Sequence, residues 1–171
     1  MRAQPQPRAT LLSHLTWRID MKTLLGAVAF SLLAMSTAAI AADKGSKEEA
    51  VAMVKRAVAL IKSDGKEKAF AAISDPANAN FHDRDLYVYV YDLNGVALAH
   101  GNNPKMVGKP LIGLKDNEGK PMIKEMVELA KTKGSGWVDF KWPNPVTKAV
   151  ESKAGYVEKV DDMFVGSGIY K

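Results

Sequence analysis

The chain has 171 residues, three histidines and no cysteine. The lack of cysteine excludes disulfides, thiolate metal sites and cysteine nucleophiles, and three histidines leave little scope for a histidine-rich metal centre. Lys and Arg number 24 against 19 Asp and Glu, a formal charge of +5. The length and the balance of apolar and charged residues are those of a globular protein with one domain, or two small ones.

The first part of the chain has the features of an export signal. Met21-Lys22 begin a short positive segment, an apolar run covers 24–35, and Ala39-Ile40-Ala41 matches an A-x-A cleavage site. We therefore expect a signal peptide over 21–42, cleaved near Ala41 or Ala42. The apolar run is short for a bilayer span, which needs about 20 residues, so an uncleaved membrane anchor is the less favoured alternative.

Residues 1–20 precede this signal as an arginine-containing extension of doubtful status. The simplest hypothesis is that translation begins at Met21; an organelle transit peptide is a weaker alternative. Removing 1–42 leaves 129 residues with 20 basic and 18 acidic side chains, a net charge of +2. We expect a single periplasmic or secreted domain over 43–171, and its low charge argues against nucleic-acid binding.

Two helical patterns begin this domain. Ser46 to Glu49 form a capping box, in which side chains of the first turn satisfy free backbone amides. Apolar residues then recur at three- and four-residue spacing as far as Ile61, which predicts a helix that ends at Asp64-Gly65. A second helical pattern covers 66–73 and stops before Asp75-Pro76.

A β-hairpin follows. Residues 86–91 read LYVYVY, and alternation places the three tyrosines on one side of this strand. Asn94-Gly95 suits the turn. The returning strand, Val96 to His100, is expected to place Val96, Leu98 and His100 on one side.

The remaining pattern is a long loop, a helix and three strands. The loop covers 101–119, and its length favours a functional role. Pro121 begins the helix, and the strands are expected at 137–142, 150–160 and 163–170. The order of elements predicts an α+β fold with one antiparallel sheet and helices on one side.

No strong catalytic motif is present. The sequence has no phosphate-binding P-loop, no G-x-S-x-G and no H-E-x-x-H. The polar stretch from His82 to Asp85 is interpreted as a solvated turn. We therefore expect no enzyme activity, no metal site and no cofactor.

Aromatic residues on the predicted strands can line one cleft, with Lys153 supplying charge for an anionic ligand. The alternative is that these aromatics are ordinary packing in the core and on the sheet. The pattern alone leaves both interpretations open.

The region 43–171 resembles the single Cache domains of bacterial extracytoplasmic sensors, which occur in chemoreceptors and sensor kinases. The resemblance rests on an ordered set of short stretches: Tyr87 to Asp92 with Gly95, Ala99-His100, Asn103-Pro104, Val107 to Lys109, Leu111, Asp116, Gly119-Lys120, Gly136 to Val138, Lys141 to Pro145, Lys153, Tyr156-Val157 and Phe164 to Tyr170.

This resemblance implies a PAS-like Cache fold, with a long N-terminal helix packed on a central antiparallel sheet and a pocket between the sheet and flanking loops. It implies as ligand-binding residues, by position, Tyr89, His100, Trp142, Lys153 and Tyr156.

The resulting hypothesis is an exported small-molecule sensor in signal transduction or chemotaxis, whose ligand bears a carboxylate. Family members in receptors continue into a transmembrane helix and a signalling domain, whereas this sequence shows no second apolar span before Lys171. A separate membrane receptor or kinase is therefore a possible partner. The alternative is a periplasmic regulatory subunit of such a receptor or kinase, with no ligand of its own.

Overall fold

The computed structural model describes residues 44–171, so the predicted extension and signal peptide lie outside the described residues. The elements in this region, in chain order, are α3 (Lys47–Asp64), α4 (Lys66–Ser74), β1 (His82–Asp83), β2 (Leu86–Tyr87), β3 (Tyr89–Asp92), β4 (Ala97–His100), a 3-10 turn η1 (Pro104–Met106), α5 (Met122–Lys133), β5 (Ser135–Pro143), β6 (Val150–Val160) and β7 (Met163–Tyr170).

Helix α3 begins and ends where the sequence predicts. The Ser46 hydroxyl accepts a hydrogen bond from the backbone N–H of Glu49, and the Glu49 carboxylate accepts one from the backbone N–H of Ser46. The predicted apolar stripe from Ala50 to Ile61 is buried. Because the stability of such a helix comes mainly from packing its apolar face, the stripe fixes α3 on the sheet.

Five antiparallel strands form the sheet, in the order β4-β3-β7-β6-β5, while β1 and β2 pair separately. β6 is the longest strand and pairs with both β5 and β7. In this register Lys153 lies between Phe140 of β5 and Tyr170 of β7. The three side chains therefore lie side by side on one face of the sheet.

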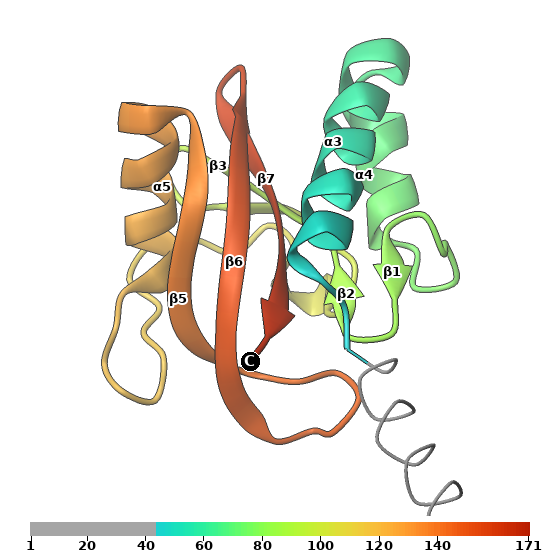
Figure 1. Cartoon of the computed structure of the whole chain (residues 1–171). Coiled ribbons are helices and arrows are strands. Elements are labelled where there is room, and N and C mark those ends of the chain that lie inside the picture. The colour runs from blue at the N-terminus through green and yellow to red at the C-terminus, as the bar shows by residue number, and fades with distance from the viewer. Residues whose placement is uncertain (1–43) are drawn as a thin grey trace, which may run out of the picture. The chain divides into compact units, whose positions relative to one another are not determined.

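Helices cover both faces of the sheet, which corrects the expectation that they lie on one side. Figure 1 shows α3 and α4 on one side of the sheet and α5 on the other. One core cluster joins α3 and α4 to Val90 and Val165, and a second joins α5 to Tyr89, Tyr91 and Phe164. Strands β3 and β7 are buried on both faces and so need cover on both.

The predicted strand over 86–91 is divided at Val88. Its backbone N–H donates to the carbonyl of Phe81, and its carbonyl accepts from Gly101 N–H. The first part thus pairs with β1, and the second with β4 and β7. The predicted alternation is confirmed, because the tyrosines belong to the α5-side core and the residues between them to the α3-side core.

The returning strand β4 does not alternate as expected. Its pairing with β3 shifts between Val90 and Tyr91, so that Val90 faces Ala99 and Tyr91 faces Ala97. Leu98 packs with the α3-side core, while His100 stacks beside Tyr89 on the other face. The irregularity adds one residue to β4, and a bulge of this kind changes which side chains share a face.

The connection between β4 and α5 is fastened to the edge of the sheet by Asp116. One carboxylate oxygen accepts from the backbone N–H groups of Glu118 and Lys120. The other accepts from the backbone N–H of Lys141 on the edge strand β5, at 2.9 Å. These hydrogen bonds lower the pKa of Asp116, with the Lys141 bond contributing most. The loop thereby satisfies a backbone donor that an edge strand would otherwise leave free.

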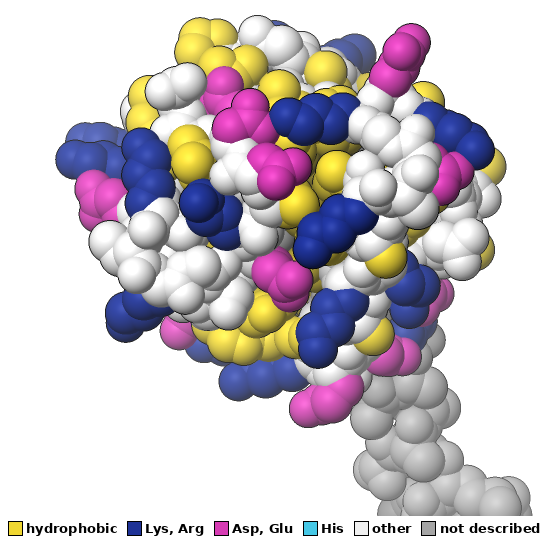
Figure 2. Space-filling view, turned by 90° about the horizontal axis from the view of Figure 1, so that it is seen from above, with side chains coloured by type: hydrophobic (Ala, Val, Ile, Leu, Met, Phe, Trp, Pro, Cys, Tyr) yellow, Lys and Arg dark blue, Asp and Glu magenta, His cyan; other side chains and the backbone are white. Residues whose placement is uncertain are grey.

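The surface of the described region mixes both signs of charge. Figure 2 shows Lys and Arg side chains interspersed with Asp and Glu on the face seen from above. None of the helices between residues 44 and 171 has the length and apolar character needed to cross a bilayer.

Candidate functional site

A small cavity lies between the sheet and α5, inside the second core cluster. Its volume is about 20 Å³, which is room for about one water molecule. It is lined by Tyr87, Tyr89, Tyr91, His100, Met122, Ile123, Met126, Phe140 and Trp142. The two methionines are flexible side chains that repack readily, so the cavity has a wall that can move when a larger molecule enters.

The ring of Tyr89 crosses the sheet above two glycines. A Cβ built on Gly166 would lie 2.2 Å from the Tyr89 ring, and one on Gly155 would lie 2.7 Å from its hydroxyl oxygen. Both strands therefore lack a side chain where the ring passes. The hydroxyl is buried and has no hydrogen-bond partner among the described residues. An unpaired buried polar group costs about 1–3 kcal/mol, so this hydroxyl favours a polar ligand atom.

His100 presents a second donor to the cavity. The side chain is buried, and its Nδ1 accepts a hydrogen bond from the backbone N–H of Asn103 at 3.0 Å. Burial and, to a lesser extent, Lys153 lower the pKa of His100 to about 4. The imidazole is therefore neutral at neutral pH and carries its proton on Nε2. No described residue accepts a hydrogen bond from Nε2.

Lys153 is completely buried beside the cavity without lining it. Its Nζ lies 3.7 Å from the ring centroid of Tyr87 and 4.4 Å from that of Tyr170, both within the range of cation–π contacts. Nζ also donates a hydrogen bond to the Tyr170 hydroxyl at 3.2 Å. Burial lowers the pKa of Lys153 well below its usual range, and the negative charge of Asp85 opposes this shift.

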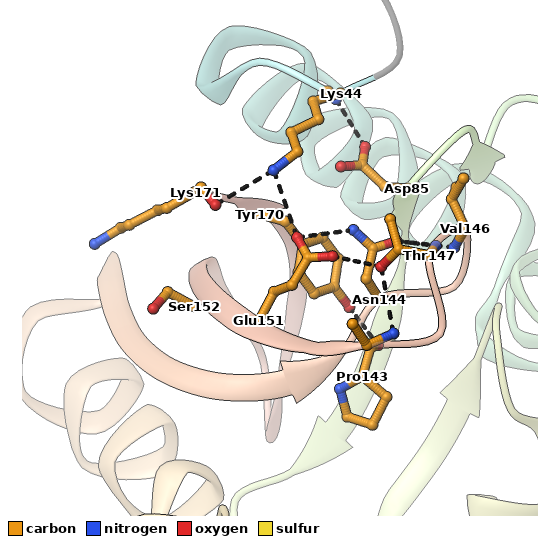
Figure 3. Close-up of polar contacts among 12 residues, drawn as sticks. Lys44, Asp85, Pro143, Asn144, Val146, Thr147, Glu151, Ser152, Tyr170 and Lys171 are labelled. Carbon is orange, nitrogen blue, oxygen red and sulfur yellow. Dashed lines mark hydrogen bonds and ion pairs between the residues drawn. The ribbon is translucent and has the colours of Figure 1, made fainter. Parts of the chain in front are cut away.

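Tyr170 holds this amine in place, and the sequence interpretation missed it. Its hydroxyl donates to the carbonyl of Pro143 at 2.7 Å while accepting from Lys153. Figure 3 shows the hydroxyl directed at Pro143. Burial raises the pKa of Tyr170, so the hydroxyl remains protonated. The signal available in the sequence was the pairing of two adjacent strands, which places Tyr170 opposite Lys153.

Asp85 corrects the interpretation of residues 82–85 as a solvated turn. Arg84 forms ion pairs with Asp83 and Glu49 at the surface, but Asp85 is only 1% exposed. Its Oδ1 accepts from the backbone N–H of Gly45 at 2.7 Å, and its Oδ2 has no hydrogen-bond partner among the described residues. The carboxylate thus lies close enough to act electrostatically on Lys153.

The turn after β5 and both ends of the described region meet close to Tyr170 and Asp85, as Figure 3 shows. Lys44 Nζ lies 3.4 Å from a carboxylate oxygen of Glu151 and 3.3 Å from the carbonyl oxygen of Lys171. The same carboxylate accepts from Asn144 and Thr147, and the Thr147 hydrogen bond is the largest contribution to its lowered pKa. The carboxylate of Glu151 is therefore already bound by Lys44, Asn144 and Thr147.

Three of the five sequence-predicted site residues, Tyr89, His100 and Trp142, line the cavity, and a fourth, Lys153, lies next to it. Tyr156 does not belong to this group, which corrects the prediction that it lines the same pocket. Its ring packs on Trp137 at 5.4 Å, and its hydroxyl donates to Glu158. Tyr156 lies three positions after Lys153 on the same strand, and an odd offset places two side chains on opposite faces.

The described residues do not gather as a metal site. Nowhere in 44–171 do three or more His, Cys, Asp or Glu side chains lie in an arrangement that would hold an ion. The polar groups at the cavity are instead hydrogen-bond donors: the hydroxyl of Tyr89 and Nε2 of His100. Nζ of Lys153 is a third donor, which lies next to the cavity against the ring of Tyr87. Donors of this kind recognise an acceptor such as a carboxylate.

A family model identifies the kind of domain that this chain forms. The model described as Single Cache domain 2 matches residues 21–171. The chain belongs to this family. Related domains occur in signalling proteins, including a chemoreceptor and a sensor kinase, and one solved neighbour with the same fold is the periplasmic sensor domain of a chemotaxis protein. The resemblance and the α+β fold expected from the sequence are thereby confirmed.

Two curated relatives are signalling proteins that contain such a domain. The chain is 32% identical over 91 residues to the methyl-accepting chemotaxis protein McpP of Pseudomonas putida. It is 31% identical over 91 residues to the sensor histidine kinase MctS of Rhizobium johnstonii. Each match covers 52% of this chain, but only 17% and 20% of the respective relatives. The likeness is therefore confined to a small part of each relative.

Solved structures show the same Cache fold over most of the chain. A methyl-accepting chemotaxis protein from Vibrio parahaemolyticus aligns with a TM-score of 0.62 at 27% identity, covering 82% of this chain and 96% of that one. A Cache chemosensory domain studied for carboxylic acid recognition aligns with a TM-score of 0.57 at 23% identity, covering 89% and 99%. At that identity the second likeness establishes the fold alone.

Proposed function

We propose that this Cache domain is an exported sensor for a small carboxylate, and that it acts in signal transduction or chemotaxis. The observation that carries the proposal is the convergence of unpaired donors on one apolar cavity. Tyr89 and His100 each present an N–H or O–H group that no described residue accepts. A carboxylate has acceptor oxygens only, so it matches these donors without leaving a new group unsatisfied.

Lys153 gives the site its preference for an anion. A carboxylate bound near its Nζ forms a charge-assisted hydrogen bond, which is about twice as strong as a neutral one. The walls formed by Met122, Met126 and Phe140 pack against the apolar part of the ligand. The small volume of the cavity favours a short acid over a long one. The domain of the distant structural neighbour, studied for carboxylic acid recognition, is consistent with this chemistry.

The proposal includes export of the domain and a partner protein that detects ligand binding. A signal peptide over 21–42 would deliver a domain of residues 43–171 to the periplasm or the exterior. A bound ligand transmits information only if it favours one of two conformations and another component detects the difference. The proposed partner is a membrane receptor or kinase, because domains of this family occur in chemoreceptors and sensor kinases.

A thermal-shift and calorimetry screen tests the function. The purified protein is titrated with straight-chain monocarboxylates from formate to hexanoate and with free amino acids. A ligand at 100 times its dissociation constant should stabilise the protein by about 2.7 kcal/mol. Matched primary alcohols serve as the control, because they keep the chain and lose the carboxylate. Equal binding of acid and alcohol, or no binding by any compound, would contradict the proposal.

The regulatory-subunit alternative has one observation in its favour, the small volume of the cavity. It also requires a large exposed apolar patch for a protein partner. Within the described region the large exposed hydrophobic side chains are only Val107, Ile112, Val146 and Val150. The unpaired donors at the cavity have no purpose in this alternative, so the sensor proposal accounts for more of the site.

A further inference from the structure

Lys153 is a fully enclosed amine with no anion of the described region bonded to it. Its exposed fraction is 0%, and Nζ donates one hydrogen bond, to the Tyr170 hydroxyl. No carboxylate among the described residues lies within 4.0 Å of Nζ to form an ion pair. An ammonium group has three donors and a full charge. Burying that charge without a close anion costs several kcal/mol, so such a group gives up its proton instead.

The groups around the amine come from every element packed against it. Strand β7 contributes Tyr170, and β4 contributes the neutral His100. Strand β2 contributes Tyr87, and the residue just before β2 contributes the buried carboxylate of Asp85, which accepts a hydrogen bond from Gly45 N–H. Asp85 is the only one of these that carries a negative charge near Lys153.

The remaining neighbours add no compensating charge. On β6 itself Glu151 is committed to Lys44, Asn144 and Thr147. The cavity-facing residues of β5 and α5 are apolar or aromatic, with Tyr89 and Tyr91 of β3 completing the wall. Burial raises the pKa of both tyrosines, so they remain neutral. Among the described residues, the amine of Lys153 therefore has one remote anion, Asp85, and no bonded anion.

We propose that each carboxylate enters this site together with one proton, because Lys153 becomes an ammonium only when the ligand supplies its counter-ion. This inference rests on the proposed function and specifies how that site is regulated. The charges balance: an uncharged amine, a carboxylate and a proton from solvent become an ammonium–carboxylate pair. No bond is broken in the ligand, and the apolar cavity gains no net charge. The domain then responds to the undissociated acid, and so to acid concentration and pH together.

Calorimetry on the full chain tests the inference. The tightest-binding member of the formate-to-hexanoate series is titrated at pH 8 in three buffers of different ionisation enthalpy. The slope of observed heat against buffer enthalpy gives the protons taken up, and we expect a value near one. Binding without proton uptake between pH 6 and 9 would overturn the inference and leave the proposed function intact. No binding by any acid would overturn both.

A pH series and two variants assign the proton. In the wild type the affinity should fall by up to tenfold for each pH unit above 8. Lys153→Arg carries a fixed charge, so its proton uptake should vanish; retained uptake would overturn the assignment. His100→Gln cannot titrate and, whatever its effect on affinity, should still take up one proton. If it takes up none, the proton belongs to His100 and the inference is wrong. If Lys153→Arg does not fold, the wild-type proton count and the His100 variant still decide.

Discussion

Tyr89 and Gly166 face each other across β3 and β7, and the missing side chain at Gly166 provides the space that the Tyr89 ring occupies. A Cβ at that position would lie 2.2 Å from the ring, far inside van der Waals contact. The position of the unpaired Tyr89 hydroxyl at the cavity thus depends on a residue of another strand that has no side chain.

Gly166→Ala should therefore damage both stability and binding. The added methyl group forces the Tyr89 ring to move, and overpacking of this kind costs about 1–3 kcal/mol. Urea unfolding measures the loss, and calorimetry with the bound acid measures the fall in affinity. Gly113→Ala is the matched control, because nothing lies within 4 Å of its Cβ position. If both variants unfold at the same urea concentration as the wild type, the steric argument is wrong.

Tyr89→Phe separates the hydroxyl from the ring. Loss of an unpaired buried hydroxyl should leave the stability of the empty protein unchanged or slightly higher. The affinity for a carboxylate should fall by roughly 10- to 100-fold, the value of one hydrogen bond to a charged group. Tyr156→Phe removes a hydroxyl from the opposite face and should leave affinity unchanged. Equal effects of the two variants would remove Tyr89 from the binding site.

Much of the fold could be predicted because its elements have long, regular patterns. The structure confirms the α3 capping box and stripe, and the strands over 150–160 and 163–170, at the expected residues. The side of Leu98 could not be predicted, because a bulge in β4 depends on how β3 pairs. The position of α5 on the second face could not be predicted, because β7 is buried at nearly every position instead of at alternate ones, and its Gly-Ser-Gly segment does not show this in the sequence.

The site was predictable where alternation along one strand determined it. The tyrosine side of β3 followed directly from the sequence, and the same rule, applied to the spacing of Lys153 and Tyr156, would have excluded Tyr156. Tyr170 and Asp85 could not be predicted from alternation alone. Tyr170 is positioned by pairing between strands, and Asp85 by a backbone amide distant in the sequence. A buried carboxylate within a polar run such as 82–85 has no local signal.

The protonation of His100 gives the domain an acid-sensitive stability. Its pKa is about 4 in the folded protein against 6.5 for an ordinary histidine. Between these values the unfolded chain binds the proton that the folded protein excludes, so stability is lost as pH falls from 6.5 to 4. The loss attributable to His100 is on the order of 3 kcal/mol. Urea unfolding of the wild type and of His100→Gln at pH 7, 5.5 and 4.5 should show a difference that shrinks on acidification. A pH-independent difference would contradict the assignment, and His82→Gln controls for removal of a histidine elsewhere.

Asp85 connects the start of α3 to the ligand site, and its removal should affect both. Asp85→Ala leaves the backbone N–H of Gly45 without its acceptor, and a buried donor left unpaired costs about 1–3 kcal/mol. The same change removes the one negative charge that favours protonation of Lys153, so carboxylate affinity should fall as well. Asp85→Asn keeps an acceptor for Gly45 and loses the charge; it should recover most of the stability and little of the affinity.

Asp83→Asn is the control: it alters an exposed ion pair with Arg84 and should change stability by less than about 1 kcal/mol. Recovery of full affinity in Asp85→Asn would show that the Asp85 charge has no part in binding, because hydrogen bonding to Gly45 alone would then suffice.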